Sequence, residues 1–118
     1  MSFEIILKNL VDLVPQAIGA IIVDWEGEAV MEYCHCDPYN IRFIAAHQAI
    51  ILSRIRELLI TPESEDVEEV VIASSGGDLI IGCINPEYSL VMNIEHSSQL
   101  STALYHFRRA ITELKKEF

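Results

Sequence analysis

The longest regular alternation of apolar and polar residues in the chain lies between Asp37 and Ile60. Asp37 can cap a helix, Pro38 suits a first helical turn, and no further Gly or Pro follows before Thr61-Pro62. At about 100° per residue, one broad stripe then collects the positions that would face a core: Ile41, Ile44, Ala45, Gln48, Ile51, Leu52, Ile55, Leu58 and Leu59. The pattern predicts a helix of roughly six turns that packs on a sheet.

A second apolar patch lies on the other side of this predicted helix. It consists of Phe43, Ala46 and Ile50, at spacings of three and four residues, and it gives way to polar residues near Arg54 and Arg56. Either the helix is covered on both sides within one domain, or the patch meets a second subunit. We favour the second interpretation, because a patch that fades along a helix suits an interface across a two-fold axis.

The chain before the long helix predicts a helix and a hairpin. Residues 2–14 place apolar side chains on one stripe between a Ser2 cap and Pro15: Phe3, Ile6, Leu7, Leu10, Leu13 and Val14. The segment Ala17–Asp24 is apolar at nearly every position, which favours a central strand that is buried on both faces. Glu26-Gly27 then turns the chain into a second strand, Ala29–Cys34.

After an acidic loop, the remaining chain predicts three strands and a closing helix. The strands Val67–Ser74, Leu79–Ile84 and Ser89–Glu95 are joined by hairpin turns at Ser75-Gly76-Gly77-Asp78 and Asn85-Pro86-Glu87. Ser97 or Ser98 can cap the final helix, whose apolar stripe is Leu100, Leu104, Phe107, Ile111 and Leu114.

These elements predict a single domain over residues 1–118 of the α/β class, of the α+β type. We expect a five-stranded antiparallel sheet in the order 2-1-5-4-3 with helices on both faces. This order leaves the Val67–Ser74 strand, with its apolar Val70, Val71 and Ile72, at an edge. An apolar edge strand is a liability unless something pairs with it. Pairing with its own symmetry mate would cover both this edge and the Phe43 patch.

Composition and charge narrow the possible partners. Of the 118 residues, 51% are apolar, more than a monomer of this size easily buries, and this excess again favours an oligomer. The longest apolar runs are too short to span a bilayer and the N-terminus does not resemble a signal peptide, so we expect a cytoplasmic protein. The net charge of −10 argues against nucleic acid and anionic membranes. Because the cations fall in predicted helices, an acidic partner would be met on a helix.

The order of elements and the first hairpin together resemble one known family. The hairpin segment Gly19–Gly27 reads GAIIVDWEG and is similar to the "gavlvdrdG" stretch of the Roadblock family, the dynein-light-chain-like proteins whose bacterial members regulate Ras-like small GTPases. The resemblance extends over nearly the whole chain. It implies a homodimer, or a heterodimer with a paralogue, with a sheet continuous through the third strands and the second helices side by side. It also implies binding to a Ras-like small GTPase, with no catalysis and no cofactor.

One local feature departs from this resemblance. Cys34, His35 and Cys36 precede the long helix, and His47 follows further on, so these four residues are candidate zinc ligands or the basis of a thiol enzyme. The Cys-x-Cys spacing is shorter than usual, and successive residues of a strand point to opposite faces. We therefore predict no metal site, no catalytic residue and reduced thiols, including Cys83 as a core residue.

Other charged residues have a structural and a functional interpretation. Asp24, Glu26 and Glu28 could hold a cation, but solvated hairpin acids are more common and the calcium-loop pattern is absent. Arg54 and Arg56 are either a solvated helix face or the residues that meet an acidic partner surface.

Three functions compete at this stage. The leading hypothesis is a non-enzymatic dimeric adaptor or regulator that binds a Ras-like small GTPase. The alternative is a small-ligand-sensing domain of the PAS or profilin-like type, with a cavity between the sheet and the long helix. The third hypothesis is a metal-dependent or thiol enzyme that uses the Cys34–Cys36 segment.

Overall fold

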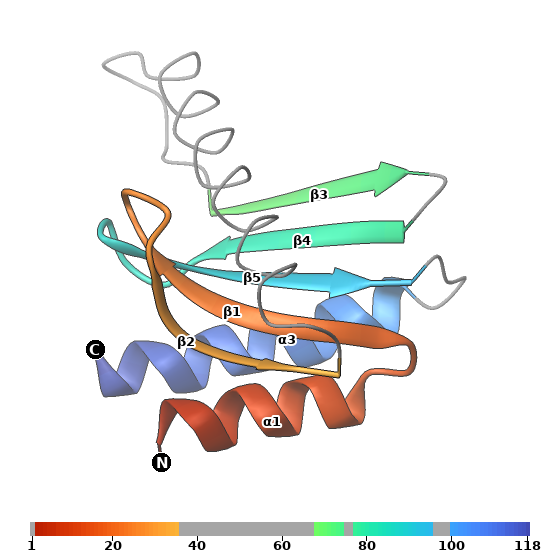
Figure 1. Cartoon of the computed structure of the whole chain (residues 1–118), viewed down its shortest axis with the longest axis horizontal. Coiled ribbons are helices and arrows are strands. Elements are labelled where there is room, and N and C mark those ends of the chain that lie inside the picture. The colour runs from red at the N-terminus through yellow and green to blue at the C-terminus, as the bar shows by residue number, and fades with distance from the viewer. Residues whose placement is uncertain (1, 36–67, 75–76, 96–99) are drawn as a thin grey trace.

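Figure 1 shows the computed structural model of the chain, which describes residues 2–35, 68–74, 77–95 and 100–118. Its elements in chain order are α1 (Phe3–Leu13), β1 (Ala17–Asp24), β2 (Ala29–Cys34), β3 (Glu69–Ser74), β4 (Gly77–Cys83), β5 (Tyr88–Ile94) and α3 (Leu100–Glu117). The segment predicted as the long helix, Asp37–Ile60, and the acidic loop after it lie outside the described residues.

The strands form one antiparallel sheet in the order β2-β1-β5-β4-β3, which confirms the predicted fold class and strand order. The first two strands have the predicted bounds, whereas each of the last three is displaced by one or two residues. The sequence predicts Asp78 in a turn, but it belongs to β4, where it pairs with Ala73 and Ile94 and is only 5% exposed. The β4 strand begins at Gly77, whose φ of +145° explains the glycine there.

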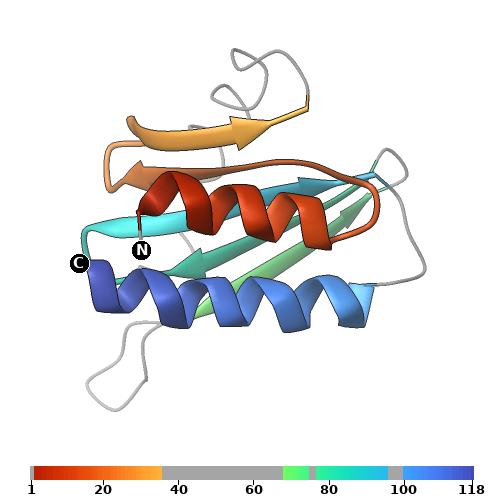
Figure 2. The same cartoon turned by 90° about the horizontal axis from the view of Figure 1, so that it is seen from below.

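The helices α1 and α3 lie side by side and antiparallel on one face of the sheet (Figure 2). Ser2 caps α1, with its Oγ accepting a hydrogen bond from the N–H of Ile5 at 3.4 Å. The two chain ends meet, because the ring of Phe3 stacks on that of Phe118 with centroids 4.7 Å apart. The beginning and the end of the sequence therefore close the same face of the sheet.

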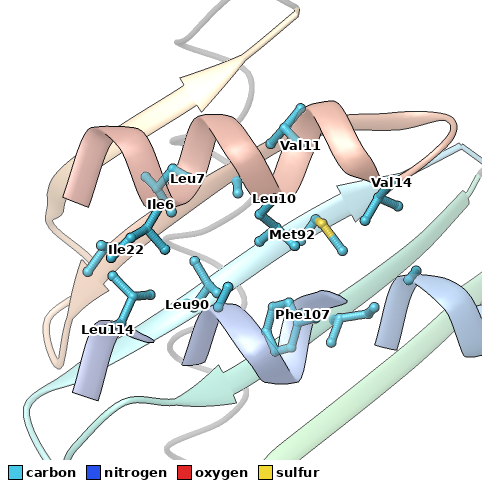
Figure 3. Packing of buried hydrophobic residues seen from close by; sticks show 14 of the residues in the cluster. Ile6, Leu7, Leu10, Val11, Val14, Ile22, Leu90, Met92, Phe107 and Leu114 are labelled. Atoms are coloured by element: carbon cyan, nitrogen blue, oxygen red, sulfur yellow. The ribbon is translucent and has the colours of Figure 1, made fainter. Parts of the chain in front are cut away.

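The main core fills the space between these helices and the sheet. In Figure 3, buried side chains of α1 and α3 meet those of Ile22, Leu90 and Met92 from the central strands. Phe107 of α3 is fully buried above Gly82, where an added Cβ would lie 2.6 Å from the Phe107 ring. Gly82 therefore provides the space that the largest buried side chain of α3 occupies.

The amphipathic pattern of α1 was predicted with one error. Leu13 was placed in the buried stripe but is 59% exposed, whereas Val11 is buried. Because α1 contacts the sheet and also α3, its buried arc is rotated toward Leu7 and Val11 and away from Leu13.

The opposite face of the sheet carries a second buried cluster: Ile21, Val23, Leu79, Ile81 and Val91. The central residues of β1 and β4 are buried consecutively, so both faces of these strands are covered, as their uniform apolarity predicted. None of the described helices combines the length and the apolar composition needed to cross a membrane.

Candidate protein-binding surface

The edge strand β3 is the best-placed part of the proposed interface that the structure describes. It pairs with β4 from Glu69↔Gly82 to Ser74↔Gly77, and no strand among the described residues pairs with its outer side. The outer edge of a sheet is in general the place where a further strand can add. This position agrees with the edge predicted from the sequence.

The side chains of β3 divide between the two faces of the sheet. Val70 and Ile72 are half-buried and pack against the second cluster, whereas Val71 points to the face of α3 and is 37% exposed. The strand is thus apolar on both faces but only partly covered. The other predicted interface residues, Phe43, Ala46 and Ile50, lie outside the described residues.

An ion pair attaches β3 to α3. Arg108 donates from Nε to Glu69 Oε1 at 3.0 Å and from Nη2 to Glu69 Oε2 at 2.8 Å. This hydrogen-bonded carboxylate raises the pKa of Arg108. Sequence reasoning missed the pair, because the two residues are 39 positions apart and only the strand order brings them together. The bidentate geometry orients the edge strand relative to the helix layer.

The structure separates the described members of the proposed cysteine–histidine site. Cys34 packs against the second cluster, while His35 lies on the other side of the strand, with Nε2 at 3.4 Å from Oδ1 of Asp12 on α1. No group of three potential ligands that could hold a metal ion gathers among residues 2–35, 68–74, 77–95 and 100–118. Cys36 and His47 fall outside these ranges, so the absence of metal remains a prediction.

Asp12 instead joins α1 to the end of β2. Its carboxylate accepts hydrogen bonds from Lys8 Nζ at 2.8 Å and from the Tyr33 hydroxyl at 3.4 Å. The hydrogen bond from Lys8 is the main cause that lowers the pKa of Asp12, and the nearby Tyr33 and His35 act in the same direction. The same pair raises the pKa of Lys8. This exposed cluster joins α1 to the end of β2.

The acidic hairpin is also structural. Asp24 Oδ1 accepts hydrogen bonds from the backbone N–H groups of Glu26 and Glu28, both at 2.9 Å. This is the side-chain-to-backbone bonding by which Asp stabilises tight turns. Because Asp24 Oδ1 is already bonded to the turn, these acids are better explained as a stabilised hairpin turn than as a cation site.

A groove of about 370 Å³ runs between α1 and α3. Its floor includes the buried side chains of Ile6 and Leu10, and its rim includes the exposed Leu13 and the polar Arg109 and Glu113. This groove is open to solvent and lies between the two helices. The cavity predicted for a ligand sensor is a different one, because it would adjoin the long helix, which lies outside the described residues.

Arg54 and Arg56, the predicted partner-binding residues, also lie outside the described residues.

Comparison with solved structures identifies proteins that share this fold. A Roadblock/LC7 domain from Streptomyces avermitilis matches with a TM-score of 0.86 and 17% identity, over 97% of this chain and 95% of that chain. MglB from Myxococcus xanthus matches with a TM-score of 0.87 and 15% identity, over 98% of this chain and 94% of that chain. Profilin IA from Acanthamoeba castellanii matches with a TM-score of 0.64 and 11% identity, over 98% of each chain.

No protein-family model matches the sequence, and a search of curated proteins found no match. The solved structures show that the chain has the fold of Roadblock/LC7 domains. They confirm, for the fold, the resemblance to the Roadblock family seen in the sequence. At these identities the similarity establishes the fold alone.

Proposed function

We propose that this protein is a non-enzymatic dimeric adaptor or regulator that binds a Ras-like small GTPase in the cytoplasm and modulates its nucleotide cycle or localisation. The observation that carries the proposal is the match in fold to Roadblock/LC7 domains and MglB along almost the whole chain. The sequence resemblance to the Roadblock family links this fold to GTPase binding. No catalytic residue and no cofactor is assigned to the protein.

Dimerisation is proposed through the edge of β3 and the apolar patch of the long helix. Val70, Val71 and Ile72 would lie beside the same strand of a second copy, and Phe43, Ala46 and Ile50 would meet their symmetry mates. Pairing of this kind satisfies the outer backbone groups of β3 and removes apolar surface from water. The partner can be a second copy of this chain or a paralogue.

Replacing Val71 with Lys tests this interface. A charged side chain on an edge strand opposes pairing with another strand, so light scattering should report a monomer. The matched control is Val30→Lys, since Val30 is 43% exposed, compared with 37% for Val71, and lies on β2 at the opposite edge of the sheet. A dimer that survives Val71→Lys but not Val30→Lys would contradict the proposal, because it would place the interface at the β2 edge of the sheet.

GTPase binding is proposed on the surface that contains Arg54 and Arg56. A regulator without catalytic groups can still change hydrolysis or exchange if it binds one conformation of the GTPase switch loops more tightly than another. The test is binding to the small GTPases of the same organism, each loaded with GDP or a GTP analogue. Failure to bind any of them would refute the function, whereas binding unaffected by Arg54→Glu/Arg56→Glu would refute only the surface.

Native mass spectrometry separates this function from the two competing ones. The proposed regulator should appear as a bare dimer. A dimer that retains a small molecule would favour the ligand-sensing domain, and one zinc ion per chain would favour a role for Cys34, His35 and Cys36. These outcomes differ in mass and do not depend on knowing the GTPase.

A further inference from the structure

The charge of α3 differs from that of the rest of the molecule. Residues 100–117 contain four of the chain's eight Lys and Arg residues but only two of its eighteen acids. A helix of charge +2 therefore belongs to a chain whose other residues total −12. Such an asymmetry indicates a surface that attracts anionic groups within an otherwise acidic protein.

The positive charges of α3 share one face. Its buried side consists of Ala103, Phe107, Ala110 and Leu114. At about 100° per residue, the opposite side collects cations, hydroxyl groups and one aromatic ring, all of them exposed: Ser101, Tyr105, Arg108, Arg109, Thr112, Lys115 and Lys116. The two acids of α3, Glu113 and the exposed Glu117, fall outside this arc, while Arg109 lies at its border and lines the groove toward α1 together with Glu113. The outer face of α3 thus carries no acidic residue.

A shallow hollow of about 330 Å³ lies in the middle of this face, lined by Ser101, Tyr105, Arg108, Arg109 and Thr112. Arg109 lies over the Tyr105 ring, 5.8 Å from its centroid, and donates from Nη1 to the Tyr105 hydroxyl oxygen at 3.4 Å. Because this oxygen accepts, the Tyr105 O–H hydrogen can be donated elsewhere. Arg108 is held by Glu69 through Nε and Nη2, which leaves Nη1 for a further acceptor.

These groups suit a carboxylate. Two guanidinium groups and a phenol hydroxyl line one hollow. Each has a contact within the protein, Arg108 with Glu69 and Arg109 with Tyr105, which reduces the side-chain entropy lost on binding. Tyr and Arg are also among the residue types enriched at the positions that contribute most to binding energy in protein interfaces. Tyr105 is 56% exposed, so part of its side chain remains available for such a contact.

We infer that the outer face of α3 is a docking surface for an acidic peptide segment of a partner protein, with a carboxylate bound between Tyr105, Arg108 and Arg109. A duplex nucleic acid or an anionic membrane is a weaker candidate, because either presents an extended negative surface that the remaining charge of −12 repels. An acidic segment can instead follow the length of one helix, about 27 Å for 18 residues. This surface is separate from the one proposed for the GTPase.

The test uses a fluorescent, Glu-rich helical peptide of about 18 residues, matched to the helix length, and the same peptide with Gln in place of Glu. Fluorescence anisotropy at low salt should show binding of the Glu peptide by the full chain, weakening as salt is added, and little binding of the Gln peptide. Arg109→Glu should weaken binding about tenfold or more, the loss typical of a hydrogen bond to a charged group.

Lys8→Glu is the matched control, because Lys8 is an exposed cation on α1 and the substitution changes the net charge equally. Tyr105→Phe should give a smaller loss than Arg109→Glu, since it removes only one hydroxyl. Circular dichroism checks that each variant remains folded.

Each of the following outcomes would overturn the inference. Equal losses from Arg109→Glu and Lys8→Glu, or no binding of the Glu peptide, would show that the face has no specific role. Tighter binding of a DNA duplex or of phosphatidylserine vesicles than of the Glu peptide would assign the face to another class of partner. A change in oligomeric state caused by Arg109→Glu would show that a second copy of the chain occupies it.

Discussion

The two faces of the sheet are built from alternate residues of the same strands but differ in how they are completed. Ile80 and Ile81 are neighbours on β4 and both are 0% exposed, yet Ile80 belongs to the core beneath α1 and α3, and Ile81 to the cluster on the opposite face. The helix face is closed by the two ends of the chain. The opposite cluster extends to β3, where Val70 and Ile72 are only partly buried.

This difference separates stability from recognition. The face closed by α1 and α3 is buried out to its rim and contributes to the stability of the single chain. The cluster on the opposite face ends at β3, whose apolar side chains are only partly buried. Apolar surface at a strand edge favours contact with another chain, and the dimer interface is proposed at this edge. The following variants compare the two faces, beginning with the largest expected effect.

Ile80→Ala and Ile81→Ala should each reduce the free energy of unfolding by about 2–5 kcal/mol, because each removes a fully buried side chain and leaves a cavity. Urea denaturation measures both. If a second copy adds to the burial of the opposite face, the loss in Ile81→Ala should grow as protein concentration rises, and that in Ile80→Ala should not. If Ile81→Ala reduces the free energy of unfolding far less than Ile80→Ala, the side chains on the opposite face of the sheet do not pack as a core.

Gly82→Ala affects the helix face alone and should cost about 1–3 kcal/mol, because the new methyl group meets the Phe107 ring. Adding Phe107→Leu should recover part of this loss, so the double variant should be more stable than the two single losses predict. Thermal unfolding of the three variants measures the coupling. Simple additivity would show that Phe107 moves aside without cost.

Glu69→Gln should loosen β3 without unfolding the sheet, since it weakens the ion pair with Arg108 on the helix face. Faster hydrogen exchange of the β3 amides, with little change in global stability, is the expected result. Glu68→Gln makes the same change of charge at the adjacent, exposed position and should have no such effect. Equal exchange rates in both variants would show that pairing with β4 holds β3 in place and that the ion pair with Arg108 does not contribute.

Asp12→Asn should have the smallest effect, and the effect should depend on pH. The folded state lowers the pKa of Asp12 below its ordinary value of 3.8, mainly through the hydrogen bond from Lys8, so its contribution is present above that pH and is lost as pH falls through the folded pKa. The wild type should therefore be more stable than Asp12→Asn at neutral pH, and the two should converge in acid. Urea midpoints between pH 7 and pH 2 test this, with the exposed Glu26→Gln as control. A constant difference would exclude the titration of Asp12 as its cause.

Much of the fold was predictable because each element carries its own local signal. The run of apolar residues from Ala17 to Val23 requires a strand covered on both faces, and Ser2 and Pro15 delimit the first helix. The edge position of β3 followed from pairing the first strand with the fifth. The proposed interface residues on the long helix, and Arg54 and Arg56, lie outside the described residues and remain predictions.

For the part of the chain that the structure describes, the sequence by itself determined the type and order of the elements, the two-sided burial of the central strands and the antiparallel sheet, because hydrophobic periodicity and turn residues act over a few positions. Only the tertiary structure decided which side chains from distant segments meet. It rotated α1 so that Val11, not Leu13, is buried, placed Phe107 over Gly82, and joined Arg108 to Glu69. These contacts depend on how helices settle on a twisted sheet, which is set by the packing of the whole core and leaves no trace in the spacing of any one segment.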